Sequence, residues 1–323
     1  RRQRCLTRPR PIPSPAAPRL EAGMAYETLL VEKEGQIDLV SLNRPERLNA
    51  LSKTMIRELR HYFAGLRDDY RTRVVILRGN GRGFCAGLDV RQDAEALRPR
   101  AAREPAPAAG EDGAAGQRPK ESEDGAAGQR PKESEVSRIL RGQRDLVDIF
   151  RQMRQAPQPI IALVHGAAAG SGFALALAAD VRLATPQAKM NVAMFKMGTT
   201  GGDMGISYFL PRMCGVSVAS ELMLTGRFIS GERALRTNLV SELYDTREAM
   251  EAGARTLAAE MLAGDDNGLR LTKECLNVSV DAPSFESAVA MEDRQQVLMV
   301  IGGGWMARTG TFAKAKASAK AKL

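Results

Sequence analysis

One stretch of 22 residues, Pro159–Asp180, constrains the fold of this chain more than any other; it reads PIIALVHGAAAGSGFALALAAD. Its opening apolar, β-branched run lies between a proline and a glycine, which predicts a short buried strand. A turn made only of small residues follows at 166–172, and an apolar helix is predicted from there to about residue 179. Small side chains let a ligand approach the backbone, and free N–H groups at a helix start suit an anionic oxygen or a phosphate. The alternative is a tight strand–helix corner whose glycines serve packing alone.

A second glycine-rich corner occurs at Val74–Val90, VVILRGNGRGFCAGLDV, where another buried strand runs into a turn. With both corners in view, the chain resembles the crotonase superfamily, the enoyl-CoA hydratase/isomerase family. Phe84–Asp89 resembles the first oxyanion motif of that family, and His165–Asp180 resembles the second. The likeness covers most of Met24–Leu97 and Val136–Gly302, with both motifs in the family's order and spacing.

Repeated alternation of predicted strands and helices independently indicates an α/β fold with crossover connections. The resemblance implies more: a crotonase-like ββα spiral core over residues 24–225, followed by a helical trimerisation region over 226–308. It also implies an acyl-CoA thioester substrate in fatty-acid β-oxidation and a homotrimer or hexamer. Coenzyme A is then part of the substrate, and no separate cofactor or metal is expected.

The resemblance places an oxyanion hole between the two corners. Loss of a proton beside a thioester carbonyl develops negative charge on its oxygen, which two backbone N–H donors stabilise efficiently. The expected donors are the N–H groups of Leu88 and Ser171. The expected substrate-binding residues around them are Ala86, Gly87, Asp89, Gly170 and Gly172. Asp89 also suits the holding of a turn, and Asp180 suits the holding of a strand start.

The catalytic acids of the family are absent from their usual places. Hydratases of the family carry two glutamates, and the matching positions here are Ala174 and Met194, neither of which carries a proton. Adding water to a double bond needs a base for the water and an acid for the α-carbon. Dienoyl-CoA isomerases of the family use one further aspartate, matched here by Asp203. We expect Asp203 to be the catalytic carboxylate; its alternative role is to cap a helix over 204–210.

Three functional alternatives follow. Within the family, hydration and double-bond isomerisation both stay open. The missing glutamates favour a non-catalytic CoA-thioester binder. A dinucleotide-binding protein is weaker, because Leu175 stands where GxGxxG needs a third small residue and no acid lies about twenty residues further on.

Charge and cysteine content exclude some classes of function. The net charge of +9 divides into +5 on residues 1–23 and +4 on residues 309–323, so the basic character belongs to two tails. With only 5% aromatic residues, this argues against a nucleic-acid groove. The sequence contains no run of eighteen apolar residues, so no membrane span is predicted. The four cysteines form no CxxC pair, which predicts free thiols in a reduced compartment and no zinc site.

The flanking and inserted segments differ in composition from the core. Residues 1–23 resemble either a mitochondrial presequence or a translated leader, and Ala321-Lys322-Leu323 resembles a peroxisomal address. Residues 99–135 contain the perfect tandem repeat EDGAAGQRPKES at 111–122 and 123–134. Its polar, Gly/Pro-rich composition predicts a disordered surface insertion.

Overall fold

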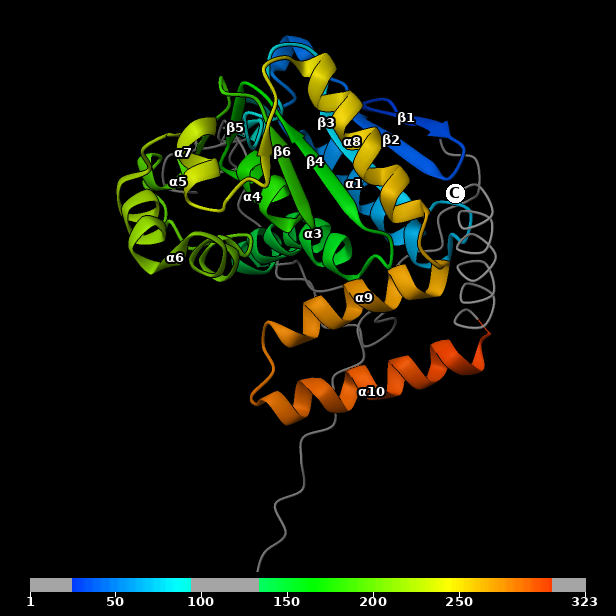
Figure 1. Ribbon diagram of the computed structural model, residues 1–323. Helices are drawn as coiled ribbons and strands as arrows, with labels where there is room; N and C mark the ends of the chain where they lie inside the picture. The colour runs from blue at the N-terminus through cyan, green and yellow to red at the C-terminus, as the bar shows by residue number, and fades with distance from the viewer. Residues whose placement is uncertain (1–24, 94–133, 304–323) are drawn as a thin grey trace, which may run out of the picture.

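The computed structural model describes residues 25–93 and 134–303, so the predictions for both tails and for nearly all of the repeat insertion lie outside it. A twisted sheet, with helices on both faces, forms the body of the described chain (Figure 1). Its strand order is β1-β2-β3-β4-β6-β9. The bounds are β1 Leu29–Glu34, β2 Ile37–Leu42, β3 Val74–Gly79, β4 Ile160–Val164, β6 Val181–Ala184 and β9 Glu242–Leu243. Within this sheet, only the β1–β2 pair is antiparallel, and the predicted α/β class is confirmed.

A second, smaller sheet has the order β5-β7-β8, with β5 Ala167–Ala169, β7 Lys189–Asn191 and β8 Ile229–Ser230. The sequence predicted 166–172 as a turn, but residues 167–169 form β5, paired in parallel with β7. Alanines carry no strand pattern, so this pairing depends on partners more than twenty residues away. Both β8 and β9 lie beyond residue 225, so the chain after the predicted core boundary completes both sheets.

Apolar periodicity in the sequence predicts helices over 136–155, with Ile139 and Leu146 on the apolar side, and over 205–212, 216–224 and 247–262, and the structure contains a helix over each range. The helix bounds are α1 Lys53–Gly65, α2 Val90–Asp93, α3 Glu135–Gln155, α4 Ser171–Ala178, α5 Ala193–Lys196, α6 Ile206–Thr225, α7 Gly231–Arg236, α8 Arg247–Leu262, α9 Asp266–Ser279 and α10 Phe285–Ile301, with 3₁₀ turns at Pro45–Arg47 and Leu66–Asp68. Ser52 caps α1 by accepting from the N–H of Met55. The two helices predicted over 205–224 form α6, which is interrupted at Gly215 by a non-helical φ of 78°.

The main sheet has a hydrophobic core on each face. Successive strand residues such as Ile76 and Leu77 point to opposite faces. Leu77 belongs to the core that includes α1, α3 and α4, and Ile76 belongs to the core that includes α8. All eight residues of α4 are buried, so this helix lies at the centre of the body rather than at its surface. No described helix is long and apolar enough to span a membrane.

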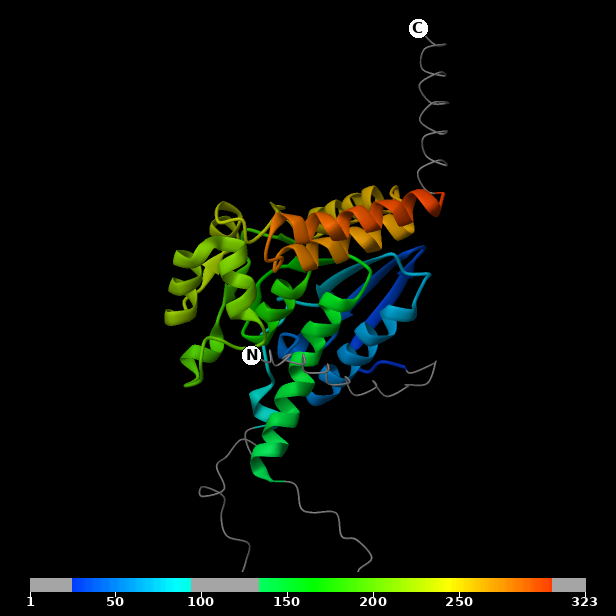
Figure 2. The same cartoon turned by 90° about the horizontal axis from the view of Figure 1, so that it is seen from below.

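The last two helices, α9 and α10, form an antiparallel pair beside the body (Figures 1 and 2). A buried ammonium fixes α9 in place: Lys273 Nζ lies 2.7 Å from Asp180 Oδ2 and donates to the carbonyls of Met153 and Gln158. Asp180 also accepts from the N–H of Ile160 at 2.8 Å. Its predicted role at a strand start is therefore confirmed.

Candidate active site

The two glycine-rich corners touch through their backbones. Cys85 donates its N–H to the carbonyl of Ala167 at 2.9 Å, and its carbonyl accepts from the N–H of Ala169 at 3.0 Å. Phe84 also donates to the carbonyl of His165 at 2.8 Å. The corners follow the adjacent parallel strands β3 and β4, whose carboxyl ends meet at one edge of the sheet. The resemblance had implied this convergence of two distant segments.

Two glycines make this contact sterically feasible. A Cβ on Gly172 would lie 2.1 Å from the carbonyl oxygen of Cys85. A Cβ on Gly87, whose φ is +102°, would lie 2.8 Å from the carbonyl oxygen of Ala169 and 3.8 Å from the nitrogen of Ser171. Packing therefore requires glycine at both positions, and this requirement is compatible with ligand binding because it brings the corners together.

The N–H groups of Leu88 and Ser171 have no acceptor among the described residues. Around Leu88, the neighbouring Gly87 carbonyl and Asp89 N–H make the two bonds to Leu51, at 2.7 and 3.0 Å. In such a parallel bridge the N–H of the middle residue, Leu88, points away from the strand partner, Leu51. Ser171 is the first residue of α4, where an N–H has no intrahelical acceptor. Both expected donors are thus available to a ligand.

Sequence reasoning missed a buried amide that fixes the first corner. Asn49 has a φ of +55° and no exposed surface; its Nδ2 donates to the carbonyls of Asn80 and Gly83 at 2.8 and 2.9 Å. Its Oδ1 accepts from the N–H of Arg44 at 2.9 Å. The available signal was an asparagine between two apolar residues just before a helix, since asparagine tolerates left-handed backbone.

The Asp89 carboxylate is occupied by an ion pair. Its Oδ2 lies 2.9 Å from Arg44 Nη2, and both side chains are largely buried, with 8% and 13% exposed. Arg44 also donates to the carbonyl of Ala50 at 2.6 Å. The turn-holding role predicted for Asp89 is confirmed, and direct contact with substrate stays a prediction.

Asp203 lies in the half-buried loop before α6. Its Oδ1 accepts from Gln143 Nε2 at 2.5 Å and from the N–H of Met204 at 2.6 Å. The cap of α6 is Gly205, and no side chain caps that helix. The helix-capping alternative for Asp203 is therefore wrong, because its carboxylate is turned toward α3 and its own loop.

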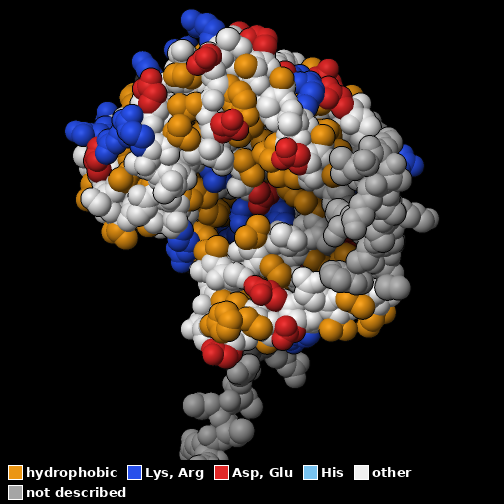
Figure 3. Space-filling model, viewed as in Figure 1, with side chains coloured by type: hydrophobic (Ala, Val, Ile, Leu, Met, Phe, Trp, Pro, Cys, Tyr) orange, Lys and Arg blue, Asp and Glu red, His pale blue; other side chains and the backbone are white. Residues whose placement is uncertain are grey.

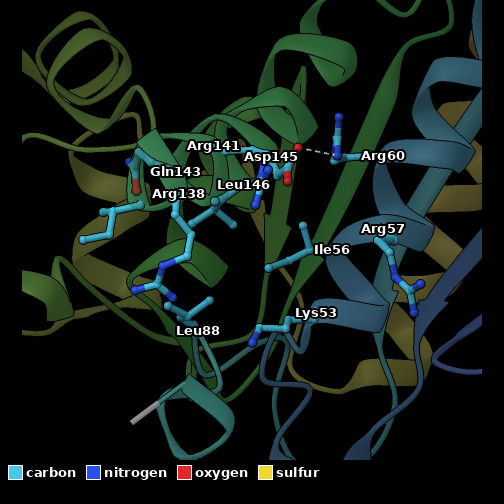
Figure 4. A pocket seen from close by; sticks show the side chains of 12 residues that line it. Lys53, Ile56, Arg57, Arg60, Leu88, Arg138, Arg141, Gln143, Asp145 and Leu146 are labelled. Carbon is cyan, nitrogen blue, oxygen red and sulfur yellow. Dashed lines mark hydrogen bonds and ion pairs between the residues drawn. The ribbon is translucent and has the colours of Figure 1, made fainter. Parts of the chain in front are cut away.

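A cavity of about 470 Å³ lies between α1 and α3 (Figure 4). Leu88, one of the two donor residues, lines it together with Gln143, the partner of Asp203. Ile56, Ile139 and Leu146 supply apolar surface. This cavity therefore connects Leu88 of the first corner with Gln143, whose amide holds the candidate carboxylate of Asp203. Ile139, expected in the buried stripe of α3, is instead 51% exposed.

The positions of the missing glutamates lie in the core. Ala174 in α4 is fully buried and Met194 in α5 is 9% exposed. Two other reactive side chains near the corners are buried as well, Cys85 and His165. Cys85 is fully buried, which raises the pKa of its thiol to about 12, and His165 Nε2 is held by the carbonyl of Gly81 at 3.0 Å. The three described cysteines are free, as predicted, and the described residues contain no cluster of side chains suited to a metal ion.

Known proteins of one family share this architecture and resemble this chain in sequence. Profiles of the enoyl-CoA hydratase/isomerase family match residues 131–299 and 37–117. The probable enoyl-CoA hydratase EchA12 of Mycobacterium tuberculosis is 33% identical over 89% of this chain and 91% of its own. The human mitochondrial Delta(3,5)-Delta(2,4)-dienoyl-CoA isomerase is 30% identical over 81% and 72%. The crystal structure of a monofunctional enoyl-CoA isomerase from M. smegmatis superposes with a TM-score of 0.60, at 31% identity, over 81% of this chain and 98% of that one.

The fold and the paired corners thus define an acyl-CoA thioester enzyme with the crotonase architecture. The chain belongs to the enoyl-CoA hydratase/isomerase family. The resemblance inferred from the two motifs is confirmed, and the dinucleotide-binding alternative is wrong.

The contact at Gly172 generates a first prediction. Gly172→Ala should lower the free energy of unfolding by about 3 kcal/mol or more, because the new methyl group overlaps backbone atoms that have no room to move. Urea unfolding measures the change. The control is Gly142→Ala in α3, where a Cβ meets nothing within 4 Å and a gain of about 0.5–1 kcal/mol is expected. Equal effects in both variants would contradict the steric account.

Burial lowers the pKa of His165 below its ordinary value of 6.5, which generates a pH prediction. Below about pH 6.5 the unfolded chain takes up a proton that the folded chain resists, so His165 lowers stability progressively as pH falls. In His165→Gln, which keeps a donor for Gly81, this part of the loss should be absent. Unfolding free energies measured from pH 8 to pH 5.5 should therefore fall less steeply for the variant; parallel curves would refute this role for burial.

Proposed function

We propose that the chain binds an acyl-CoA thioester with its carbonyl oxygen between the N–H groups of Leu88 and Ser171, and moves a proton along the acyl chain with Asp203. The reaction class is therefore double-bond isomerisation. One observation carries the proposal: two backbone donors without acceptors among the described residues lie on corners that touch, and one of the two residues, Leu88, lines a cavity together with Gln143, the partner of Asp203.

The backbone donors supply electrostatic stabilisation of the enolate. Both are fixed before substrate arrives, one by the Leu51 bridge and one by the start of α4. Removal of one such donor from other enzymes costs on the order of 3 kcal/mol of transition-state stabilisation. Because the donors are backbone groups, Ser171 serves as well as the glycine that the family commonly has there.

A single carboxylate suffices for isomerisation. Asp203 takes a proton from one carbon, forming the enolate, and returns it to another carbon of the same chain, so atoms and charge balance without a second acid. The Gln143 amide holds the carboxylate during both transfers. Hydration needs a separate acid and base, and the buried Ala174 and Met194 supply neither. Similarity to the human dienoyl-CoA isomerase supports the same choice.

The second candidate is a CoA-thioester binder without catalysis. The buried alanine and methionine at the two acid positions favour it. It differs from the enzyme in one observable: an enzyme exchanges the α-hydrogens of a bound acyl-CoA with deuterated solvent, whereas a binder leaves them in place.

The test uses a panel of 2-enoyl-, 3-enoyl- and dienoyl-CoA esters, followed by ultraviolet absorbance and mass. We expect absorbance changes without a change in mass. Asp203→Asn should lower turnover by at least about 100-fold, the usual contribution of a general acid–base group, while ester binding survives. Asp281→Asn, which removes a carboxylate bonded to Tyr208 on the surface, is the control and should keep turnover. A mass gain of one water would establish hydration instead, and unchanged turnover in Asp203→Asn would exclude this carboxylate.

We propose further that α9 and α10 pack between subunits of a homotrimer, or of a hexamer built from two trimers. The described α10 has no buried residue, and apolar side chains lie on the outer surface over both helices (Figure 3). The exposed apolar residues of this region are Leu276, Val278, Val280, Phe285, Val297, Leu298, Val300 and Ile301. A surface of this kind is typical of a contact with another protein chain.

Light scattering should therefore give at least three times the chain mass of 35.0 kDa. The double variant Val297→Glu, Ile301→Glu should shift the protein to the monomer mass, because two carboxylates would be buried without partners. Leu224→Glu, on the equally exposed end of α6, is the control. A monomeric unmodified protein would exclude this assembly.

Location and metabolic context complete the proposal. A peroxisome-type organelle, addressed through residues 321–323, or a mitochondrion, addressed through residues 1–23, would both supply acyl-CoA esters of β-oxidation. Coenzyme A enters as part of the substrate, and neither a separate cofactor nor a nucleic acid is needed for the chemistry.

A further inference from the structure

One buried hydroxyl in the second corner has no hydrogen-bond partner. Ser171 is 3% exposed, and its Oγ makes no hydrogen bond to any described residue. A buried hydroxyl in this situation has given up its bonds to water and gained none in return, which destabilises the folded chain. Most buried polar side-chain atoms of native proteins do have a partner. The Oγ of Ser171 is therefore suited to a partner that the substrate supplies.

The hydroxyl lies at the same end of α4 as one of the two backbone donors. Ser171 is the first residue of this helix, and all eight residues of the helix are buried. Helix side chains lean toward the N-terminal end of their helix, which is also the end at which the free N–H groups lie. The hydroxyl of Ser171 thus leans toward the side on which its own N–H is free, and rotation about the single χ1 bond sets its position.

The other backbone donor is close to this end of α4. A Cβ on Gly87 would lie 3.8 Å from the nitrogen of Ser171, and the peptide unit that follows Gly87 carries the N–H of Leu88. Two further side-chain donors near the corners are already engaged. Cys85 Sγ donates to the carbonyl of Asn49 at 3.1 Å, and His165 Nε2 is held by a carbonyl at 3.0 Å. The hydroxyl of Ser171 has no such bond.

The proposed reaction creates a use for a third donor. The carbonyl oxygen of a thioester has two lone pairs, which the N–H groups of Leu88 and Ser171 can fill. The enolate oxygen carries negative charge and a third lone pair, and hydrogen bonds to a charged acceptor are shorter and stronger. A bond that forms only with this charged state lowers the barrier to reaction without tightening the binding of the ester.

We infer that the side-chain hydroxyl of Ser171 donates a third hydrogen bond to the thioester oxygen as the enolate forms. The inference rests on the proposed function, because it takes the position of that oxygen from it. The hydroxyl keeps its proton throughout, and Asp203 is still the group that carries a proton between carbons, so the balance of the reaction is unchanged. Ser171 is then a catalytic residue through its side chain as well as its backbone.

The test uses one saturated ester, hexanoyl-CoA, for both binding and enolate formation. Calorimetry gives its affinity, and mass measurement in deuterated water gives the rate at which the saturated enzyme exchanges its α-hydrogens. Ser171→Ala removes the hydroxyl and keeps the N–H. We expect exchange to slow by about tenfold, the size expected for a lost hydrogen bond to a charged group, with the affinity unchanged. Ser171→Gly, which also keeps the N–H, should slow exchange to the same extent.

Stability provides a readout that separates catalysis from packing. Ser171→Ala should be at least as stable to urea as the unmodified protein, because it deletes a buried hydroxyl without a partner. Ser41→Ala is the matched control. Ser41 is also fully buried, but its Oγ accepts from Arg78 Nε at 2.8 Å. This variant should therefore show the opposite pattern, a loss of stability with the exchange rate kept.

The other outcomes contradict the inference in different ways. An unchanged exchange rate in Ser171→Ala assigns the hydroxyl to packing, while the proposed function stands. A loss of affinity equal to the loss of rate means that the hydroxyl binds the ester and the enolate alike. Slower exchange together with lower stability indicates a structural role. If the unmodified protein binds hexanoyl-CoA and does not exchange its α-hydrogens, the proposed function and the inference are both wrong.

Discussion

The structure depends on one close approach, in which the backbone of the second corner lies against the carbonyl of Cys85. Two hydrogen bonds to Ala167 and Ala169 hold the corners together, and Gly172 lets α4 begin directly beneath that carbonyl. Because β3 and β4 are parallel neighbours, both corners leave the sheet at the same edge. The start of α4, the strand β5 and the position of Leu88 all follow from this contact. Asn49 and the Asp89–Arg44 pair then fix the first corner from its other side.

This arrangement separates binding from proton transfer. In the proposed site, the thioester oxygen is stabilised by backbone groups, whereas the proton is moved by a side chain that has to be placed independently. The chain keeps the first component and lacks the glutamates usual for the second, with core residues Ala174 and Met194 in their places. In the proposed reaction, Asp203 takes over from a different loop and is held by a third element, α3, through Gln143.

Local patterns predicted most of the fold. The helical pattern over 247–262 predicted α8 with its observed bounds, and the glycine corners predicted the family. Features that depend on distant partners were not predictable in this way. The alanines of β5 become a strand only because β7 and Cys85 pair with them. Asn49 acts through carbonyls more than thirty residues away. The cavity needs α1 beside α3, and the whole repeat insertion lies between these two helices in the sequence.

The use of main-chain amides as donors has a genetic consequence. Nearly every coded substitution at residue 88 or 171 preserves an N–H, and proline is the one residue that deletes it. If residues 88 and 171 are the donors, as proposed, binding of a thioester tolerates substitution at both positions, while the chemistry performed on it can change through single side chains elsewhere. A protein with such a pair of corners can therefore acquire a new reaction while it keeps the same mode of substrate binding.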